Sequence, residues 1–258
     1  MFSKYTQTCI DLAKKAGENL KIGYNSTFEI NSKSGINDLV TEYDLIAEKV
    51  MTNELLILYP EHSILAEESG LNDNKSDYQW IIDPLDGTVN FANKLPIFSV
   101  SIALKYKKEI VSGCVYNPIS DELFYAEKDK GSFLNGKILS VSKCNDIKTS
   151  FLVTGFPYNV NENPLNCLET FVSIVSQGIP VRRLGSAALD LCYVADARFD
   201  GYWEVALKPW DMAAGKLILE EAGGKVTHYD GSNHNFIKTS IIASNSLIHE
   251  SLINLVNQ

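Results

Sequence analysis

The chain has 258 residues, a length that allows one large domain or two halves. Hydrophobic residues make up 45% of it and charged residues 21%, which is typical of a globular protein with a sizeable core. The net charge of −9 argues against nucleic acid or an anionic membrane as the main partner, because both require a basic surface.

The first half begins with two predicted helices, one over residues 4–22 and one after Asp44, where apolar residues fall on one helical face. Asn135-Gly136 has the composition of a tight turn. Short apolar runs between these points predict strands at 63–66, 79–82, 98–105, 110–116 and 123–126.

The second half alternates between strands and helices. A boundary is expected near residue 145, so that a single domain of residues 1–258 has an N-terminal half (about 1–145) and a C-terminal half (about 146–258). Clustered strands followed by alternating elements predict layered sheets and helices. We expect strands at 150–154, 199–205, 225–229 and 241–244, and helices at 164–176, 187–197, 212–222 and the C-terminus.

The most informative motif is the segment 80–88, in which an apolar strand leads into Asp83-Pro84-Leu85-Asp86-Gly87-Thr88. Pro84 is expected to end the strand because it lacks a backbone donor. Residues 88–92 are expected to open a helix. Two carboxylates at such a strand-to-helix junction suit a divalent cation beside a phosphate, since carboxylates hold the cation and helix-terminal amides hold the anion.

A rival phosphatase motif, D-x-D-G-T, uses its first Asp as a nucleophile. Here the residue two positions before Asp86 is Pro84, so no aspartyl-phosphate can form at that position. The spacing therefore favours direct attack by a metal-activated water.

Three further acidic segments are weaker signals when each is taken alone. Glu67-Glu68 can be a solvated turn, Asp211 can be a helix N-cap, and the segment 37–44 with Asp44 can be an extended stretch before a capped helix.

Together these motifs resemble the inositol monophosphatase family in order and spacing, over nearly the whole chain. The resemblance also includes the segments 182–190, 201–204 and 221–224. It implies an α/β fold of alternating helix and sheet layers, an αβαβα sandwich. It also implies two or three Mg²⁺ per site, held by Glu67, Asp83, Asp86, Asp211 and the backbone carbonyl of Leu85.

The resemblance further implies catalytic roles for Thr88, Asp44 and Glu67, with Thr88 and Asp44 orienting the attacking water. Phosphate and alcohol would be bound by residues that match the family's substrate pocket: Lys33, Gly87, Thr88, Gly185, Ser186, Ala187 and Glu204. Two Mg²⁺ would neutralise four carboxylates, and a third would make the site positive, which reconciles an acidic chain with an anionic substrate.

The implied activity is hydrolysis of a small phosphate monoester, with myo-inositol monophosphate as the leading substrate, and lithium is expected to inhibit it. Fructose 1,6-bisphosphate, 3′-phosphoadenosine 5′-phosphate and histidinol phosphate remain alternative substrates. A non-catalytic role as a binding partner of transcription machinery is the alternative of another class. We expect a homodimer in the cytoplasm, since the five scattered cysteines suit a reducing compartment and no segment resembles a signal peptide or a membrane span.

Overall fold

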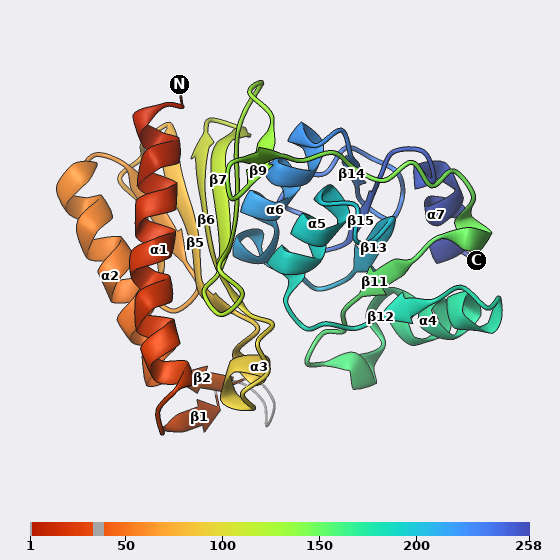
Figure 1. The fold of residues 1–258 in the computed structure, drawn as a ribbon, viewed down its shortest axis with the longest axis horizontal. Helices are drawn as coiled ribbons and strands as arrows, with labels where there is room; N and C mark the ends of the chain where they lie inside the picture. Colours follow the sequence, from red (N-terminus) through yellow and green to blue (C-terminus); the bar gives the residue numbers. More distant parts are fainter. Residues whose placement is uncertain (1, 33–38) are drawn as a thin grey trace.

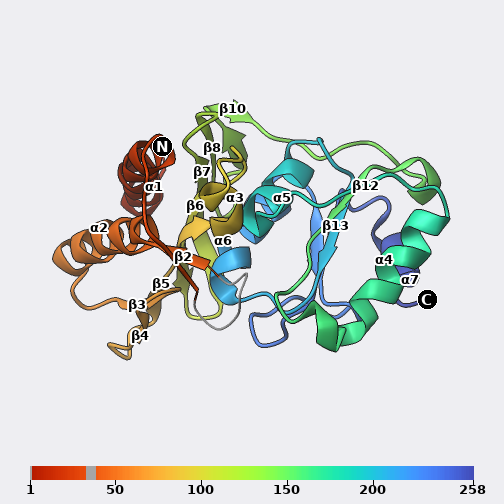
Figure 2. The ribbon, with the colours of Figure 1, turned by 90° about the horizontal axis from the view of Figure 1, so that it is seen from below.

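A computed structural model describes residues 2–32 and 39–258, and helices and sheets alternate in it as five layers (Figures 1 and 2). The outer layer on one side holds α1 (Lys4–Tyr24) and α2 (Glu42–Leu58). An eight-stranded sheet follows, and then α5 (Ala187–Ala195) and α6 (Pro209–Glu221). A five-stranded sheet and the helices α4 (Cys167–Ser176) and α7 (His249–Val256) complete the stack. The predicted layered α/β fold is confirmed.

The eight-stranded sheet has the order β10-β9-β8-β7-β6-β5-β3-β4, and β3 runs parallel to β5 while the other neighbours are antiparallel. Its strands are β3 (Ser63–Ala66), β4 (Gly70–Asn72), β5 (Tyr78–Asp86), β6 (Ser99–Tyr106), β7 (Glu109–Asn117), β8 (Glu122–Glu127), β9 (Ser132–Leu134) and β10 (Lys137–Ile138).

The five-stranded sheet has the order β12-β11-β13-β15-β14. Its strands are β11 (Leu152–Thr154), β12 (Val181–Arg182), β13 (Gly201–Glu204), β14 (Lys225–Thr227) and β15 (Ile241–Ser244). The short strands β1 (Ile30–Ser32) and β2 (Leu39–Thr41) form a separate pair, and α3 (Thr88–Ala92) follows β5. The eight-stranded sheet ends before residue 145 and the five-stranded sheet begins after it, and the division of a single domain there stays a prediction.

The central helix layer is packed between both sheets. All nine residues of α5 are buried, because this helix has protein on every side. The small residues of α6 allow an equally close approach: a Cβ on Gly113 of β7 would lie 3.0 Å from the Cα of Ala214. Trp80 and Trp203 are also buried, as expected for packing residues.

Several predicted boundaries were wrong. The helix expected after Asp44 begins at Glu42, and the helix expected over 187–197 ends at Ala195. Pro84 does not end β5, which continues to Asp86. The strand instead has a register shift between Asp83 and Asp86, since the missing donor at Pro84 interrupts the ladder as a bulge. The helix predicted from residue 164 begins at Cys167, because Leu165 and Asn166 have left-handed backbone conformations.

The predicted start of the helix that carries Asp211 was also wrong. Helix α6 begins at Pro209, whose fixed φ suits the first helical position, so Asp211 lies in the first turn and is not the N-cap.

Among the described residues, no helix has both the length and the hydrophobicity that a membrane span needs.

Candidate active site

Parallel pairing of β3 and β5 brings the first two acidic segments together. Ala66 pairs with Ile82, so the residues that follow them lie side by side: Glu67 directly after the end of β3, and Asp83 within β5. The Glu67 amide donates to the Ile82 carbonyl at 3.2 Å and extends the pairing to this point.

The bulge in β5 directs Asp86 toward the start of α5. Its Oδ2 accepts hydrogen bonds from the Ser186 hydroxyl at 2.5 Å and from the Ala188 amide at 2.9 Å. Ser186 is also the N-cap of α5 and accepts from the Leu189 amide. The start of α5, a helix of the second half of the chain, thus holds the carboxylate of Asp86 from the first half.

Asp211 reaches the same place from α6. Ser101 of β6 pairs with Asp83 in the sheet, and its hydroxyl donates to the Trp210 carbonyl at 3.2 Å. This contact joins the first turn of α6 to the strand beside Asp83. One Asp211 oxygen accepts from the Lys208 amide at 2.6 Å.

Asp83 and Asp86 are buried and Asp211 is half-buried, and the pKa values of these three carboxyl groups are raised. Burial is the largest cause, and it raises the pKa of Asp86 to about 6. The pKa of Asp83 is raised well above its usual value by burial and then by the charges of Glu67, Asp86 and Asp211. Burial and the charge of Asp86 likewise raise the pKa of Asp211.

The four side chains line one cavity without forming a closed cage. No group of three or more His, Cys, Asp or Glu side chains in residues 2–32 and 39–258 is already arranged to hold an ion. One reason is visible in the hydrogen bonds, since one oxygen of Asp83 accepts from the Leu85 amide at 3.0 Å and those of Asp86 and Asp211 are engaged as described above.

Thr88 and Asp44 are in hydrogen-bond contact beside the acidic residues. The Thr88 hydroxyl lies 3.1 Å from Asp44 Oδ1 and 3.0 Å from the Leu85 carbonyl, both of which can accept its proton. Asp44 Oδ2 accepts from the amide and the hydroxyl of Thr41, which caps α2. Burial, the largest cause, raises the pKa of Asp44 to about 6.

The predicted substrate residues of the described chain line the same cavity as the carboxylates. Gly87 and Gly185 both have positive φ, and a Cβ on Gly87 would lie 3.1 Å from the Gly185 carbonyl oxygen, so the two loops approach closely because glycine is present. Glu204 at the end of β13 accepts from the Tyr202 hydroxyl at 2.5 Å. Burial raises the pKa of Glu204 to about 7.

The cavity that these residues line has a volume of about 560 Å³. All the predicted site residues line it except Asp44, which lies behind Thr88, and Lys33, which lies outside the described residues. The sequence analysis did not select Gly155, although a Cβ there would lie 2.1 Å from Glu204 Oε2. The lining residues that were missed include Gly155, Phe156, Pro157, Tyr158 and Asn159, and the signal for them was the Gly-Phe-Pro sequence after β11.

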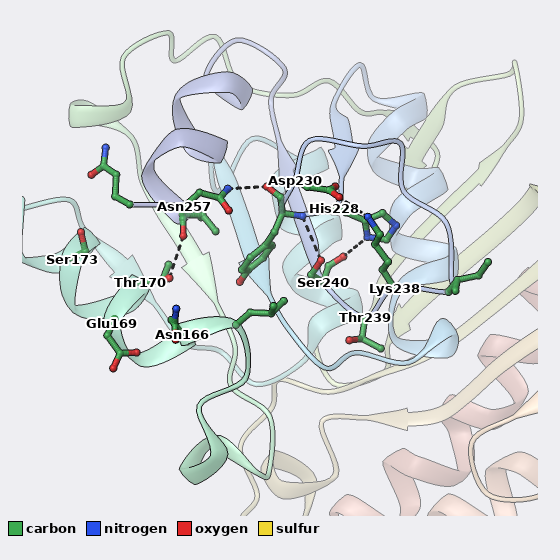
Figure 3. A pocket seen from close by; sticks show the side chains of 15 residues that line it. Asn166, Glu169, Thr170, Ser173, His228, Asp230, Lys238, Thr239, Ser240 and Asn257 are labelled. Carbon is green, nitrogen blue, oxygen red and sulfur yellow. Dashed lines mark hydrogen bonds and ion pairs between the residues drawn. The ribbon is translucent and has the colours of Figure 1, made fainter.

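A larger cavity, of about 890 Å³, lies between α4, the end of α7 and the segment 228–240 (Figure 3). Two of its charged or ionisable groups already have partners: a ring nitrogen of His228 is 2.8 Å from the Ser240 carbonyl, and Asp230 pairs with Lys238. None of the predicted site residues lines it. We therefore place the candidate active site at the smaller, acidic cavity.

An αβαβα sandwich with four carboxylates around a cavity between its sheets defines the class to which this protein is assigned. The chain belongs to the inositol monophosphatase family, whose model matches residues 1–258. It is 40% identical over 243 residues to Nus factor SuhB of Escherichia coli K12, covering 93% of this chain and 91% of the relative.

Solved structures agree with this assignment. The extragenic suppressor protein SuhB of Bartonella henselae has a TM-score of 0.94 and 39% identity, with 99% of both chains covered. The inositol monophosphatase of Anabaena has a TM-score of 0.87 and 38% identity, covering 98% of this chain and 94% of that one.

Proposed function

We propose that the chain is a Mg²⁺-dependent phosphatase of small phosphate monoesters. The observation that carries this proposal is a set of three carboxylates, of which Asp83 and Asp86 are buried and Asp211 is half-buried. Within residues 2–32 and 39–258, none of them forms a salt bridge with a basic side chain. Buried negative charges without a cation are costly, so this donor set fits a divalent cation.

The proposed ligands are oxygens only, as Mg²⁺ prefers. They are the carboxylates of Glu67, Asp83, Asp86 and Asp211 and the carbonyl of Leu85, with two or three ions per site. When bound, Mg²⁺ supplies charge stabilisation for the leaving group and lowers the pKa of water.

Thr88 and Asp44 would orient the attacking water and accept its proton. A water hydrogen-bonded to Thr88 Oγ1 can transfer a proton to that oxygen as the hydroxyl proton moves to Asp44 Oδ1, 3.1 Å away. The raised pKa of Asp44, about 6, suits a proton acceptor near neutral pH. Glu67, next to Asp83, would assist catalysis from the same wall.

The remaining residues would bind the substrate. Gly87 caps α3, so the amides of Gly87 and Thr88 lie at a helix start, which favours phosphate oxygens. We propose Lys33 as a further phosphate contact. The alcohol would lie against Gly185, Ser186, Ala187 and Glu204, which line the cavity.

Myo-inositol monophosphate is the proposed substrate, and the inositol monophosphatase of Anabaena among the similar structures supports it. A rate panel with inositol monophosphate, fructose 1,6-bisphosphate, 3′-phosphoadenosine 5′-phosphate and histidinol phosphate at saturating Mg²⁺ tests this choice. The highest kcat/KM is expected for inositol monophosphate, with inhibition by lithium. A preference for another ester would reassign the substrate, and no Mg²⁺-dependent rate on any ester would contradict the phosphatase proposal.

A binding role in transcription is the second candidate, and the relatives that carry the name Nus factor SuhB favour it. The acidic balance of the chain suits a protein partner better than direct contact with RNA. A pull-down from cell extract with the wild type and with Asp83→Asn separates the two roles. Equal retention of a transcription protein by both would support binding independent of catalysis, and no retention by either would contradict it.

We also propose that the chain is a cytoplasmic homodimer. The five cysteines are unpaired thiols, which suits a reducing compartment. Light scattering on the purified protein tests the dimer, with a mass near twice 28.7 kDa as the expected result.

A further inference from the structure

Helix α2 carries a second buried carboxylate on the same face as Asp44. Glu48 lies four residues after Asp44, a spacing that places both side chains on one side of the helix. Its side chain is 5% exposed, so its oxygens need hydrogen-bond donors from the protein.

Glu48 obtains these donors from the turn that carries Glu67. Oε2 accepts from the Glu68 amide at 2.8 Å, and Oε1 accepts from the Ser69 amide at 2.9 Å. The contact is bidentate, with each oxygen directed at one backbone N–H, and bonds to an ionised acceptor are stronger than neutral ones.

The position of the turn explains why it needs this support. Strand β3 ends at Ala66 and β4 begins at Gly70, so the two amides held by Glu48 lie between the strands, outside their ladder. Fixing the two residues after Glu67 restricts the backbone from which the Glu67 side chain extends.

One helix therefore supports two walls of the cavity. Asp44 contacts Thr88 at the start of α3, which follows β5, and Glu48 holds the turn after β3. Since these two segments follow adjacent parallel strands, a rigid helix that contacts both sets the distance between Glu67 and Thr88.

We propose that Glu48 is a positioning residue that orients Glu67 toward the bound cation through the backbone amides of Glu68 and Ser69. This inference rests on the proposed metal-dependent function. Glu48 acts only through Glu67, because both of its own oxygens are engaged by backbone amides.

Glu48→Gln tests the proposal, since it keeps the shape of the side chain but replaces one acceptor with an amide that faces a donor. Mn²⁺ binding to the folded protein is measured by electron paramagnetic resonance. We expect the affinity to fall by about 10- to 100-fold, the usual effect of losing support for a metal ligand. Excess metal should restore most of kcat, which a merely misfolded variant would not show.

Glu54→Gln is the matched control, because it removes the same charge from the same helix at a residue that pairs with Lys15 outside the cavity. Its Mn²⁺ affinity should equal that of the wild type. Equal affinity of Glu48→Gln and the wild type would overturn the role of Glu48 alone. Absence of Mn²⁺ binding by the wild type would overturn the metal site and this inference together.

Hydrogen exchange on the wild type tests the contact without a variant that must fold. The Glu68 and Ser69 amides should exchange slowly although they lie in a turn. Exchange at the rate of free peptide amides would show that Glu48 does not hold them, and would overturn the proposal.

Discussion

Two buried carboxylates on the eight-stranded sheet, Glu127 and Asp83, have pKa values shifted in opposite directions. Glu127, at the end of β8, accepts from the Ser3 amide, the Thr6 hydroxyl and Lys130. Burial by itself would raise its pKa, but these hydrogen bonds lower it to about 2. Asp83 is as well buried as Glu127, and its pKa is raised.

Burial raises the pKa of both carboxyl groups, but the partners of Glu127 oppose this effect whereas the neighbours of Asp83 add to it. Glu127 has a cation and two neutral donors from its own chain, so its charge is stabilised in the fold. The neighbours of Asp83 are other carboxylates. The charge of Glu127 is therefore stabilised within the protein itself. Asp83 and its neighbouring carboxylates have the electrostatics of a site that needs an external cation.

Removing the central carboxylate should have the largest effect on activity. Asp83→Asn is expected to lower kcat by at least about 10³-fold, because it removes the charge of a carboxylate that would hold the Mg²⁺ on which catalysis depends. The metal-free variant should unfold no more easily than the wild type, since a mutually repelling charge is removed. Steady-state rates and thermal unfolding measure the two effects, and a near-normal rate at saturating Mg²⁺ would remove Asp83 from the mechanism.

The next largest effect concerns proton transfer. Thr88→Val keeps the shape of the side chain but removes the hydroxyl that contacts Asp44, and kcat should fall by about 10²-fold. Mg²⁺ affinity should change little. If calorimetry shows that Mg²⁺ binding is lost along with the rate, Thr88 acts on the metal site and not on the water.

Glu127→Gln tests the carboxylate whose pKa is lowered by its hydrogen bonds. It leaves Lys130 without its carboxylate and places an amide against the donors of Ser3 and Thr6, at a cost of about 1–3 kcal/mol in the free energy of unfolding. The rate per folded molecule should be unchanged. Urea denaturation measures the loss, and unaltered stability would mean that the hydrogen bonds of Glu127 contribute nothing net.

The smallest expected effect is a pH trend in the metal-free protein. Asp86 has a folded pKa of about 6, raised from 3.8, so its contribution to stability is present at low pH and is lost as the pH rises through about 6. Stabilisation by Mg²⁺ should therefore be larger at about pH 7 than at about pH 5. Thermal unfolding with and without Mg²⁺ measures this, and equal stabilisation at both pH values would contradict it.

Local sequence patterns were sufficient for most elements of the fold. The apolar run before Asp83 predicted β5, and α1 and β15 agree with the periodicity of their residues. The errors lie where two local preferences compete. Pro84 disfavours a strand, yet pairing with β6 on both sides of the bulge keeps β5 continuous through it.

The candidate site could be predicted from the sequence only in part, for a different reason. Its residues were found through motifs and family resemblance, but their contacts depend on long-range pairing that no local pattern encodes. Glu48 illustrates this, because in sequence it is one more acidic residue on a helix. Only the return of the chain after β3 brings the Glu68 amide to it.

Diffraction from a crystal soaked in Mn²⁺ tests the central claim most directly, because anomalous scattering locates the ion without reference to activity. The account predicts a peak among Glu67, Asp83, Asp86 and Asp211, with the Leu85 carbonyl within coordinating distance. A fully occupied Mn²⁺ elsewhere and no density at these carboxylates would contradict it.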